Sequence, residues 1–171
     1  TGILLLSDDF KASVTDPYIM GFRYIGNTAT TSASTANRVQ QDFTADETIA
    51  IGDLVRFVTS ADVGLTAGRV IKAAATTYAA AEVIGVSRGS ATQGSAVSVI
   101  LSGMASIKFG SSPAASSNGQ KVFLSTVAGQ ATLTAPSGAN NAVLVLGRLS
   151  GATGSLATPQ CVVKIQEAIA P

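Results

Sequence analysis

Residues 52–58 read Gly-Asp-Leu-Val-Arg-Phe-Val, and this order of residue types returns later in the chain. Three more short runs follow it: Gly-Arg-Val-Ile-Lys-Ala at 68–73, Val-Ile-Gly-Val-Ser at 83–87 and Val-Ser-Val-Ile-Leu at 97–101. Each run is rich in β-branched and apolar residues and is bounded by Gly, Ser or Thr, which is the pattern of a strand between turns. The four runs therefore predict four strands.

A second series repeats this order. It reads Gly-Gln-Lys-Val-Phe-Leu-Ser at 119–125, Gly-Gln-Ala-Thr-Leu-Thr-Ala at 129–135, Val-Leu-Gly-Arg-Leu at 145–149 and Val-Val-Lys-Ile at 162–165. Matching glycines lie 67, 61 and 62 positions apart, from 52 to 119, from 68 to 129 and from 85 to 147. Two readings stay open: duplication of a β unit, or chance similarity between Gly- and Val-rich segments.

We expect an all-β protein, a compact β-sandwich or barrel built from two similar β units, with an extended N-terminal arm or loop region. Turn residues recur about every 8 to 12 positions, as in sandwiches and barrels. The one helical turn expected lies at 77–82. The predicted organisation is an N-terminal arm or loop-rich region at 1–48, a first β unit at 49–103 and a second at 104–171, packed with the first as one body.

Composition excludes several classes of partner. Only 12% of the 171 residues are charged and the net charge is +1, with no block of like charge. Affinity for nucleic acid depends on basic residues that neutralise phosphates, so we expect no nucleic-acid partner. No run approaches the roughly 18 apolar residues of a membrane helix, so we expect no membrane partner. Few charges and many small residues are typical of a surface that meets other protein subunits.

The first 48 residues hold most of the aromatic side chains and a low-complexity stretch at 26–37. The stretch has no apolar period, which predicts an exposed loop or extended arm. Its apolar and aromatic neighbours either dock on a partner or belong to a core. The candidate residues of such an interface, with a partner or with another subunit, are Ile3, Leu4, Leu5, Phe10, Tyr18, Phe22 and Tyr24. No basic residue precedes the first apolar run, so no secretory signal is predicted. We expect synthesis in a reducing cytoplasm, which the single cysteine also fits.

The residues offer little chemistry. Histidine is absent, which removes the commonest general base and metal ligand. The single cysteine, Cys161, is either a buried small hydrophobe or a reactive thiol, and Asp53 either caps the turn before its strand or binds a metal. Arg56, Arg88 and Arg148 are either interface partners of carboxylates or solvated side chains. We therefore predict no enzyme, no catalytic or metal site and no cofactor.

The succession GDLVRF, GRVIKA, EVIGVSRGSATQGSAVSVILSG, GQKVFLS, GQATLTA, VLGRLSG and VVKI, over about residues 49–167, resembles bacteriophage capsid decoration proteins. These are also called cement or head-stabilising proteins. In that family a "GD-x-V" strand, a "G-x-V-x-K-A" strand and a "V-x-G-V" stretch recur in this order. Residues 1–48 depart from the family pattern, because this region is longer and more aromatic than a minimal member of the family requires.

The resemblance implies a virion structural protein that binds the outside of an assembled capsid and stabilises it. The implied partner is the major capsid protein, with the protein itself a homo-oligomer, a trimer or dimer, on the shell. Similar β modules occur in tail fibres and baseplates, so a module that binds the host surface or a glycan is the alternative. Surface tyrosines stack on sugars in such modules, and this chain has Tyr18, Tyr24 and Tyr78.

Overall fold

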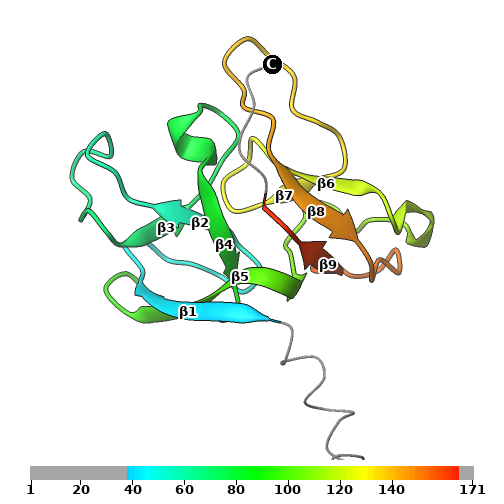
Figure 1. The fold of residues 1–171 in the computed structure, drawn as a ribbon, viewed down its shortest axis with the longest axis horizontal. Helices are drawn as coiled ribbons and strands as arrows, with labels where there is room; N and C mark the ends of the chain where they lie inside the picture. Colours follow the sequence, from blue (N-terminus) through cyan, green and yellow to red (C-terminus); the bar gives the residue numbers. More distant parts are fainter. Residues whose placement is uncertain (1–37, 166–171) are drawn as a thin grey trace, which may run out of the picture. The chain divides into compact units, whose positions relative to one another are not determined.

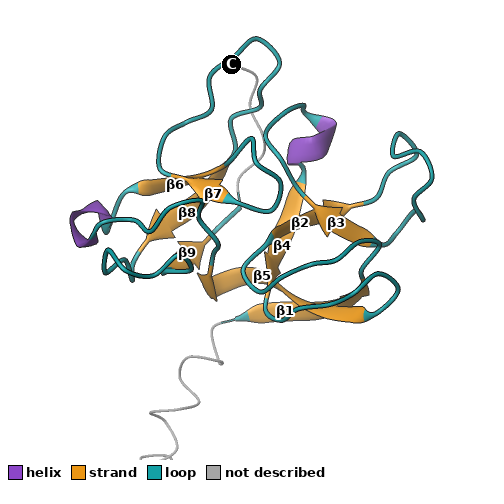
Figure 2. Ribbon diagram, turned by 180° about the vertical axis from the view of Figure 1, so that it is seen from behind, coloured by secondary structure: helices purple, strands orange, loops and turns teal. Residues whose placement is uncertain are grey.

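The computed structural model describes residues 38–165, which form one antiparallel sheet joined by loops and two helical turns (Figures 1 and 2). This part of the chain contains no α-helix, which confirms the predicted all-β class. The strands are β1 (Val39–Thr44), β2 (Leu54–Phe57), β3 (Val70–Lys72), β4 (Val83–Ser87), β5 (Ala96–Ser106), β6 (Lys121–Leu124), β7 (Ala131–Thr132), β8 (Val145–Leu149) and β9 (Gln160–Val163). The 3-10 turns are η2 (Ala79–Ala81), inside the segment predicted to be helical, and η3 (Ala115–Ser117).

The sheet consists of two similar units, as predicted. Its strand order is β3-β2-β4-β5-β9-β8-β6-β7, with β1 paired to β5. In the first unit β5 lies between β4 and β1, and in the second unit β9 lies between β8 and the later part of β5. The later part of β5 therefore takes in the second unit the place that β1 takes in the first. Figure 1 shows β1–β4 on one side and β6–β8 on the other, with β5 passing between them.

The sheet of each unit curls strongly, and one isolated parallel bridge connects its two edges. We call each curled unit a half-barrel. In the first unit Ala45, just after β1, bridges to Val70 of β3. In the second unit Phe109, just after β5, bridges to Ala131 of β7. Because these two bridges occupy matching positions, the repeated unit runs from β1 to the middle of β5 and then from the middle of β5 to β9.

The pairing registers match residue for residue. Val55 lies opposite Gly85 in the first unit, and Val122 lies opposite Gly147 in the second. Directly after each of these pairs the register shifts by one residue, so each unit has a β-bulge in the same place. A bulge bends its strand and increases the twist of the sheet, which is the geometry a half-barrel needs.

Glycine is required at both bulges. A Cβ on Gly85 would lie 2.5 Å from the carbonyl oxygen of Ile100 on the neighbouring strand. A Cβ on Gly147 would meet the carbonyl oxygen of Val162, and Gly147 also has a φ of +152°. Backbone of the adjacent strand thus passes too close to both positions for any side chain.

Loop hydrogen bonds repeat as well. The amide of Gly52 donates to the carbonyl of Ser87, and the amide of Gly119 donates to that of Leu149. The turn before each of the two glycine-led strands is closed in the same way, by Asp53 to Ala50 and by Gln120 to Ser117. Similarity at this level comes from a shared backbone path, so it supports duplication over chance similarity.

Two apolar clusters follow from this arrangement. The smaller fills the first half-barrel and contains Ala45, Ile49, Val55, Val70, Ala91, Val97 and Val99. The larger fills the second half-barrel and extends over the outer surface of the first, where Leu54, Val86 and Ile100 are buried. The first unit is therefore apolar on both faces, one face closed on itself and the other packed against the second unit.

Neither predicted boundary, after residue 48 or after residue 103, coincides with a boundary between the observed units. β1 falls within the predicted N-terminal region 1–48 and pairs with β5, so the repeat begins ten residues earlier than the sequence patterns indicated. The expected break after residue 103 lies inside β5, close to the point where that strand passes from β1 to β9. β1 escaped notice because its residues are exposed except for half-buried Phe43, which leaves no apolar alternation to read.

Candidate functional site

The interface residues predicted near the N-terminus, Ile3, Leu4, Leu5, Phe10, Tyr18, Phe22 and Tyr24, lie outside the described residues. Their proposed role stays a prediction. Within residues 38–165 no group of three or more His, Cys, Asp and Glu side chains is placed to hold a metal ion. No helix in these residues is long and apolar enough to span a membrane.

Asp53 caps a turn, as predicted. Its Oδ2 accepts the Ala50 amide at 2.8 Å, and its Oδ1 lies 3.2 Å from Nζ of Lys108. The side chain is 2% exposed. Asp53 belongs to the first unit and Lys108 to the second, so this ion pair joins the two units. A buried carboxylate with an amide and an ammonium as partners has a structural role.

Arg56 is not an interface side chain, because it is buried in an internal ion pair. Its Nη1 and Nη2 donate to the two carboxylate oxygens of Asp62 at 2.8 and 2.6 Å. Asp62 also accepts the backbone amide of Thr59 at 2.8 Å. The Arg56 hydrogen bond, followed by the Thr59 amide, holds the pKa of Asp62 well below its ordinary value. The cluster fastens the loop after β2 to the sheet.

The remaining ion pairs also involve the first unit. Asp46 pairs with Arg69 at 3.0 Å, and Glu47 pairs with Lys72 at 3.4 Å. Each of the four pairs formed among the described residues draws its acid from residues 46–62. The acids of the chain are thus concentrated early in the sequence: nine of ten precede residue 83, and the tenth is Glu167.

The second unit therefore carries cations without acids. Residues 83–166 contain Arg88, Lys108, Lys121, Arg148 and Lys164 and not one Asp or Glu. Lys108 has Asp53 as its partner. Arg88 lies on the first unit and donates to Gln40 at 3.2 Å. The other three cations lie on the second unit.

Strand pairing brings these three cations onto one side of the second unit. Lys121 of β6 lies opposite Arg148 of β8, and Arg148 lies opposite Val162 of β9. Directly opposed residues on antiparallel strands point to the same face. Lys164 follows Val162 by two positions and so lies on that face too. We call the surface formed by Lys121, Arg148, Val162 and Lys164 the basic face.

The basic face is exposed and partly apolar. Lys121, Arg148 and Lys164 are exposed, and Val162 is 47% exposed. Met104 pairs with Val162, and Phe123 is two residues from Lys121, so these half-buried side chains lie on the same side of the sheet. Arginine, methionine and aromatic residues are enriched in protein interfaces. The basic face thus combines cations with apolar side chains that are partly exposed to water.

The matching face of the first unit is interior. By the registers above, Leu54 matches Lys121, Val86 matches Arg148 and Ile100 matches Val162. Leu54 and Val86 are fully buried and Ile100 is 3% exposed, because this face packs against the second unit. The two units therefore stack head to tail. The basic face lies at the free end of this stack, and none of the described residues covers it.

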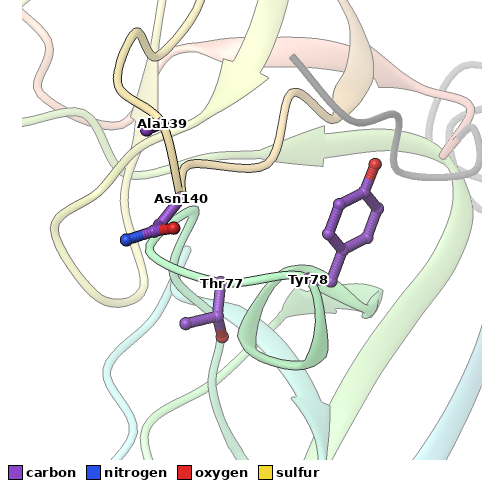
Figure 3. Close-up of a pocket in the computed structure, with 4 residues that line it drawn as sticks. All are labelled: Thr77, Tyr78, Ala139 and Asn140. Carbon is purple, nitrogen blue, oxygen red and sulfur yellow. The ribbon is translucent and has the colours of Figure 1, made fainter.

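A shallow hollow of ≈ 280 Å³ lies beside Tyr78 and is lined by Thr77, Tyr78, Ala139 and Asn140. Tyr78 is 47% exposed. Figure 3 shows the Asn140 amide turned away from the Tyr78 ring, so the polar groups of the hollow do not converge on a common point. Binding sites for small ligands have converging polar groups, and the hollow lacks this feature.

Cys161 is fully buried, with Val163 on the same face and half-buried Ile165 beyond it. Burial raises the pKa of its thiol to about 12. A thiol with so high a pKa is almost wholly protonated at neutral pH and is a poor nucleophile. Cys161 is therefore a small core residue.

Sequence reasoning missed the basic face. It found a net charge near zero and no block of cations, and both observations are correct. The signal it overlooked is the long acid-free stretch at 83–166, which separates the two signs of charge along the chain. Register information was then needed to bring Lys121 and Arg148 together. A search against protein-family models and curated proteins found no match for the chain.

Proposed function

We propose that the protein is a virion structural protein that binds the outside of an assembled phage capsid and stabilises it as a decoration, or cement, protein. Its partner is the major capsid protein, and on the shell it forms a homo-oligomer, a trimer or dimer, at local symmetry axes. It is not an enzyme and uses no cofactor. It is made in the bacterial cytoplasm and resides on the capsid surface.

The observation that carries this proposal is the agreement between the resembling residues and the repeated scaffold. The glycine-led strands that resemble decoration proteins are those that build the two half-barrels. Glycines of the shared pattern, Gly85 and Gly147, mark the two bulges. The resemblance thus extends over features that set the backbone path, and it is not confined to one loop.

The low charge content supports the same proposal. Only 12% of the residues are charged, and in residues 38–165 most of the acids are occupied in internal ion pairs. A protein that stabilises a shell acts by binding one state of the shell more tightly than others, which lowers the free energy of that state. Repeated attachment over the lattice lets each contact be weak.

Co-sedimentation tests this function. Purified protein is mixed with expanded, undecorated capsids and, separately, with unexpanded procapsids, and the bound amount is measured against the major capsid protein. We expect saturable binding to expanded shells alone, near an integer ratio to the capsid subunit. Absence of binding to both shells would refute decoration and turn attention to tail proteins and host-surface glycans.

The predicted N-terminal arm has its own test within this assay. Residues 38–165 contain two apolar cores, so a protein lacking residues 1–36 is expected to fold with an unchanged β-type circular dichroism spectrum. If the arm anchors the protein, the shortened protein will lose binding to expanded shells. Undiminished binding would show that the body alone makes the contact.

A further inference from the structure

We propose that the basic face is the surface with which the protein contacts the shell, and that it docks on an acidic, partly apolar patch of the major capsid protein. This inference rests on the function proposed above. It adds the side of the molecule that faces the partner and the chemistry of the partner's surface.

The charges of the basic face favour an acidic partner. Lys121 and Arg148 lie directly opposite each other on β6 and β8, and none of the described acids pairs with either. Like charges directly opposite on neighbouring strands destabilise a sheet. Arg148 Nη1 donates to the Gly119 carbonyl at 2.7 Å, which positions the guanidinium but leaves its charge without a described carboxylate. A carboxylate on a partner would offset the repulsion between Lys121 and Arg148.

The charges of the basic face are all of one sign, which solubility alone does not require. The terminal unit of a stack needs a polar outer face to stay soluble, and either sign of charge would supply it. Here every charge on the face is positive, while Val162 remains 47% exposed at its centre. Charges of one sign around exposed apolar groups favour a complementary protein surface.

The repeated unit already uses the matching face for packing. In the first unit the matching face carries Leu54, Val86 and Ile100 and is covered by the second unit. The scaffold thus already uses this face for protein packing. In the second unit the face keeps an apolar centre at Val162 but has cations around it, which suits a contact that must form after folding, in water.

A protein partner is favoured over nucleic acid. A protein that grips duplex DNA neutralises about 6–10 phosphates in typical cases, whereas the basic face has three cations. Its half-buried Met104 and Phe123 are suited to side-chain packing. The partner is therefore a protein surface with carboxylates around a small apolar area.

The test compares three proteins on expanded shells: wild type, the double variant K121E/R148E and the control R88E. Arg88 is also exposed but lies on the first unit, so R88E reverses one charge away from the basic face. We expect K121E/R148E to bind at least about tenfold more weakly at 50 mM salt, with a smaller difference at 300 mM because salt screens exposed charges. R88E and the conservative variant K121R/R148K are expected to bind like wild type.

Each outcome decides between the two proposals. Wild-type binding that K121E/R148E retains would overturn the basic-face inference and leave the decoration function standing. Wild-type failure on all shells would overturn the function, and the inference with it. A parallel binding assay with a 20-base-pair DNA duplex completes the test: tight binding at physiological salt that depends on Lys121 and Arg148 would assign the face to nucleic acid and refute a protein partner. Circular dichroism melts of all variants exclude misfolding as the cause.

Discussion

The two units share a backbone and differ in where their charges lie. Both have the same strand order, a bulge at the same pair and the same turn hydrogen bonds. Yet the four ion pairs of the described chain all draw their acid from the first unit, and the described part of the second unit contains no Asp or Glu. Turn glycines and strand registers thus preserve a repeated fold while its surfaces are free to diverge.

Packing determines whether the outer-face residues of each unit are apolar or charged. The outer face of the first unit is covered, so its residues became apolar, as Leu54 and Val86 are. The outer face of the second unit is open, and the matching residues are Lys121 and Arg148. Side-chain differences between the units thus report which surfaces are interior and which meet solvent or a partner.

The largest change in the free energy of unfolding is expected when the residues at one matched position, 54 and 121, are exchanged. L54K would place an ammonium in the main core and is expected to lower the free energy of unfolding by about 4 kcal/mol or more. K121L removes a cation opposite Arg148 and is expected to leave stability unchanged or raise it by up to about 0.5 kcal/mol. Urea denaturation followed by circular dichroism measures both.

If L54K does not fold, L54A against K121A gives the same comparison. L54A is expected to cost about 2–5 kcal/mol, as other large-to-small core changes do, and K121A almost nothing. Similar losses for both members of either pair would mean that the basic face is not open to solvent as described.

Substitution of the two bulge glycines is expected to give the next largest loss of stability. G147A is expected to cost about 3–5 kcal/mol, because its Cβ would meet the Val162 carbonyl and its φ of +152° is strained for alanine. G85A has the backbone clash without a positive φ and should cost less, about 2–4 kcal/mol. Chemical denaturation measures the difference between them.

G89A serves as the control for the bulge variants. Nothing lies within 4 Å of a Cβ placed on Gly89, so a change of less than about 0.5 kcal/mol is expected. Equal and small effects at all three glycines would show that the bulges do not determine the curl of the units.

Much of the fold was predictable because the glycines act locally. A glycine at a bulge or tight turn leaves its mark in the sequence whatever packs around it, so the matches of 52 with 119 and 85 with 147 revealed the repeat. β1 was not predictable, because an exposed strand needs no apolar pattern. Its equivalent, the later part of β5, shares its place in the sheet but little of its composition.

The basic face was beyond sequence patterns for a different reason. Lys121, Arg148 and Lys164 lie on three strands, and no local pattern joins them. Which face Arg148 occupies depends on the bulge at Gly147, since a shift of one residue moves every later side chain to the other face. That information resides in the pairing of strands.

The ion pairs of the first unit predict a difference in pH dependence. Since the pKa of Asp62 is lowered by Arg56 and Thr59, its contribution to stability is fully present above the ordinary carboxyl pKa of 3.8 and is lost as the pH falls toward the lower folded-state value. D62N is expected to cost about 1–3 kcal/mol at pH 7. The gap between wild type and D62N should stay constant from pH 7 to 5 and shrink below pH 4 or so.

Denaturation at a series of pH values measures this gap. D42N is a matched control, because Asp42 is exposed on β1 and takes part in none of the ion pairs of residues 38–165. It should show no gap at any pH. A gap for D62N that grows as the pH falls would contradict the lowered pKa and the internal role of Arg56.

The smallest effect is expected at Cys161, where the comparison itself supplies the substitution. Cys161 lies opposite Leu149 as Val99 lies opposite Ser87, and both residues are buried inside their half-barrels. C161V therefore installs the residue that the same scaffold already holds, and a change of less than about 1 kcal/mol is expected in urea denaturation. In wild type a thiol reagent should label Cys161 only as the protein unfolds, because burial holds the thiol pKa near 12. A loss of several kcal/mol in C161V, or rapid labelling of the native protein, would show that the interiors of the two units are less alike than their backbones.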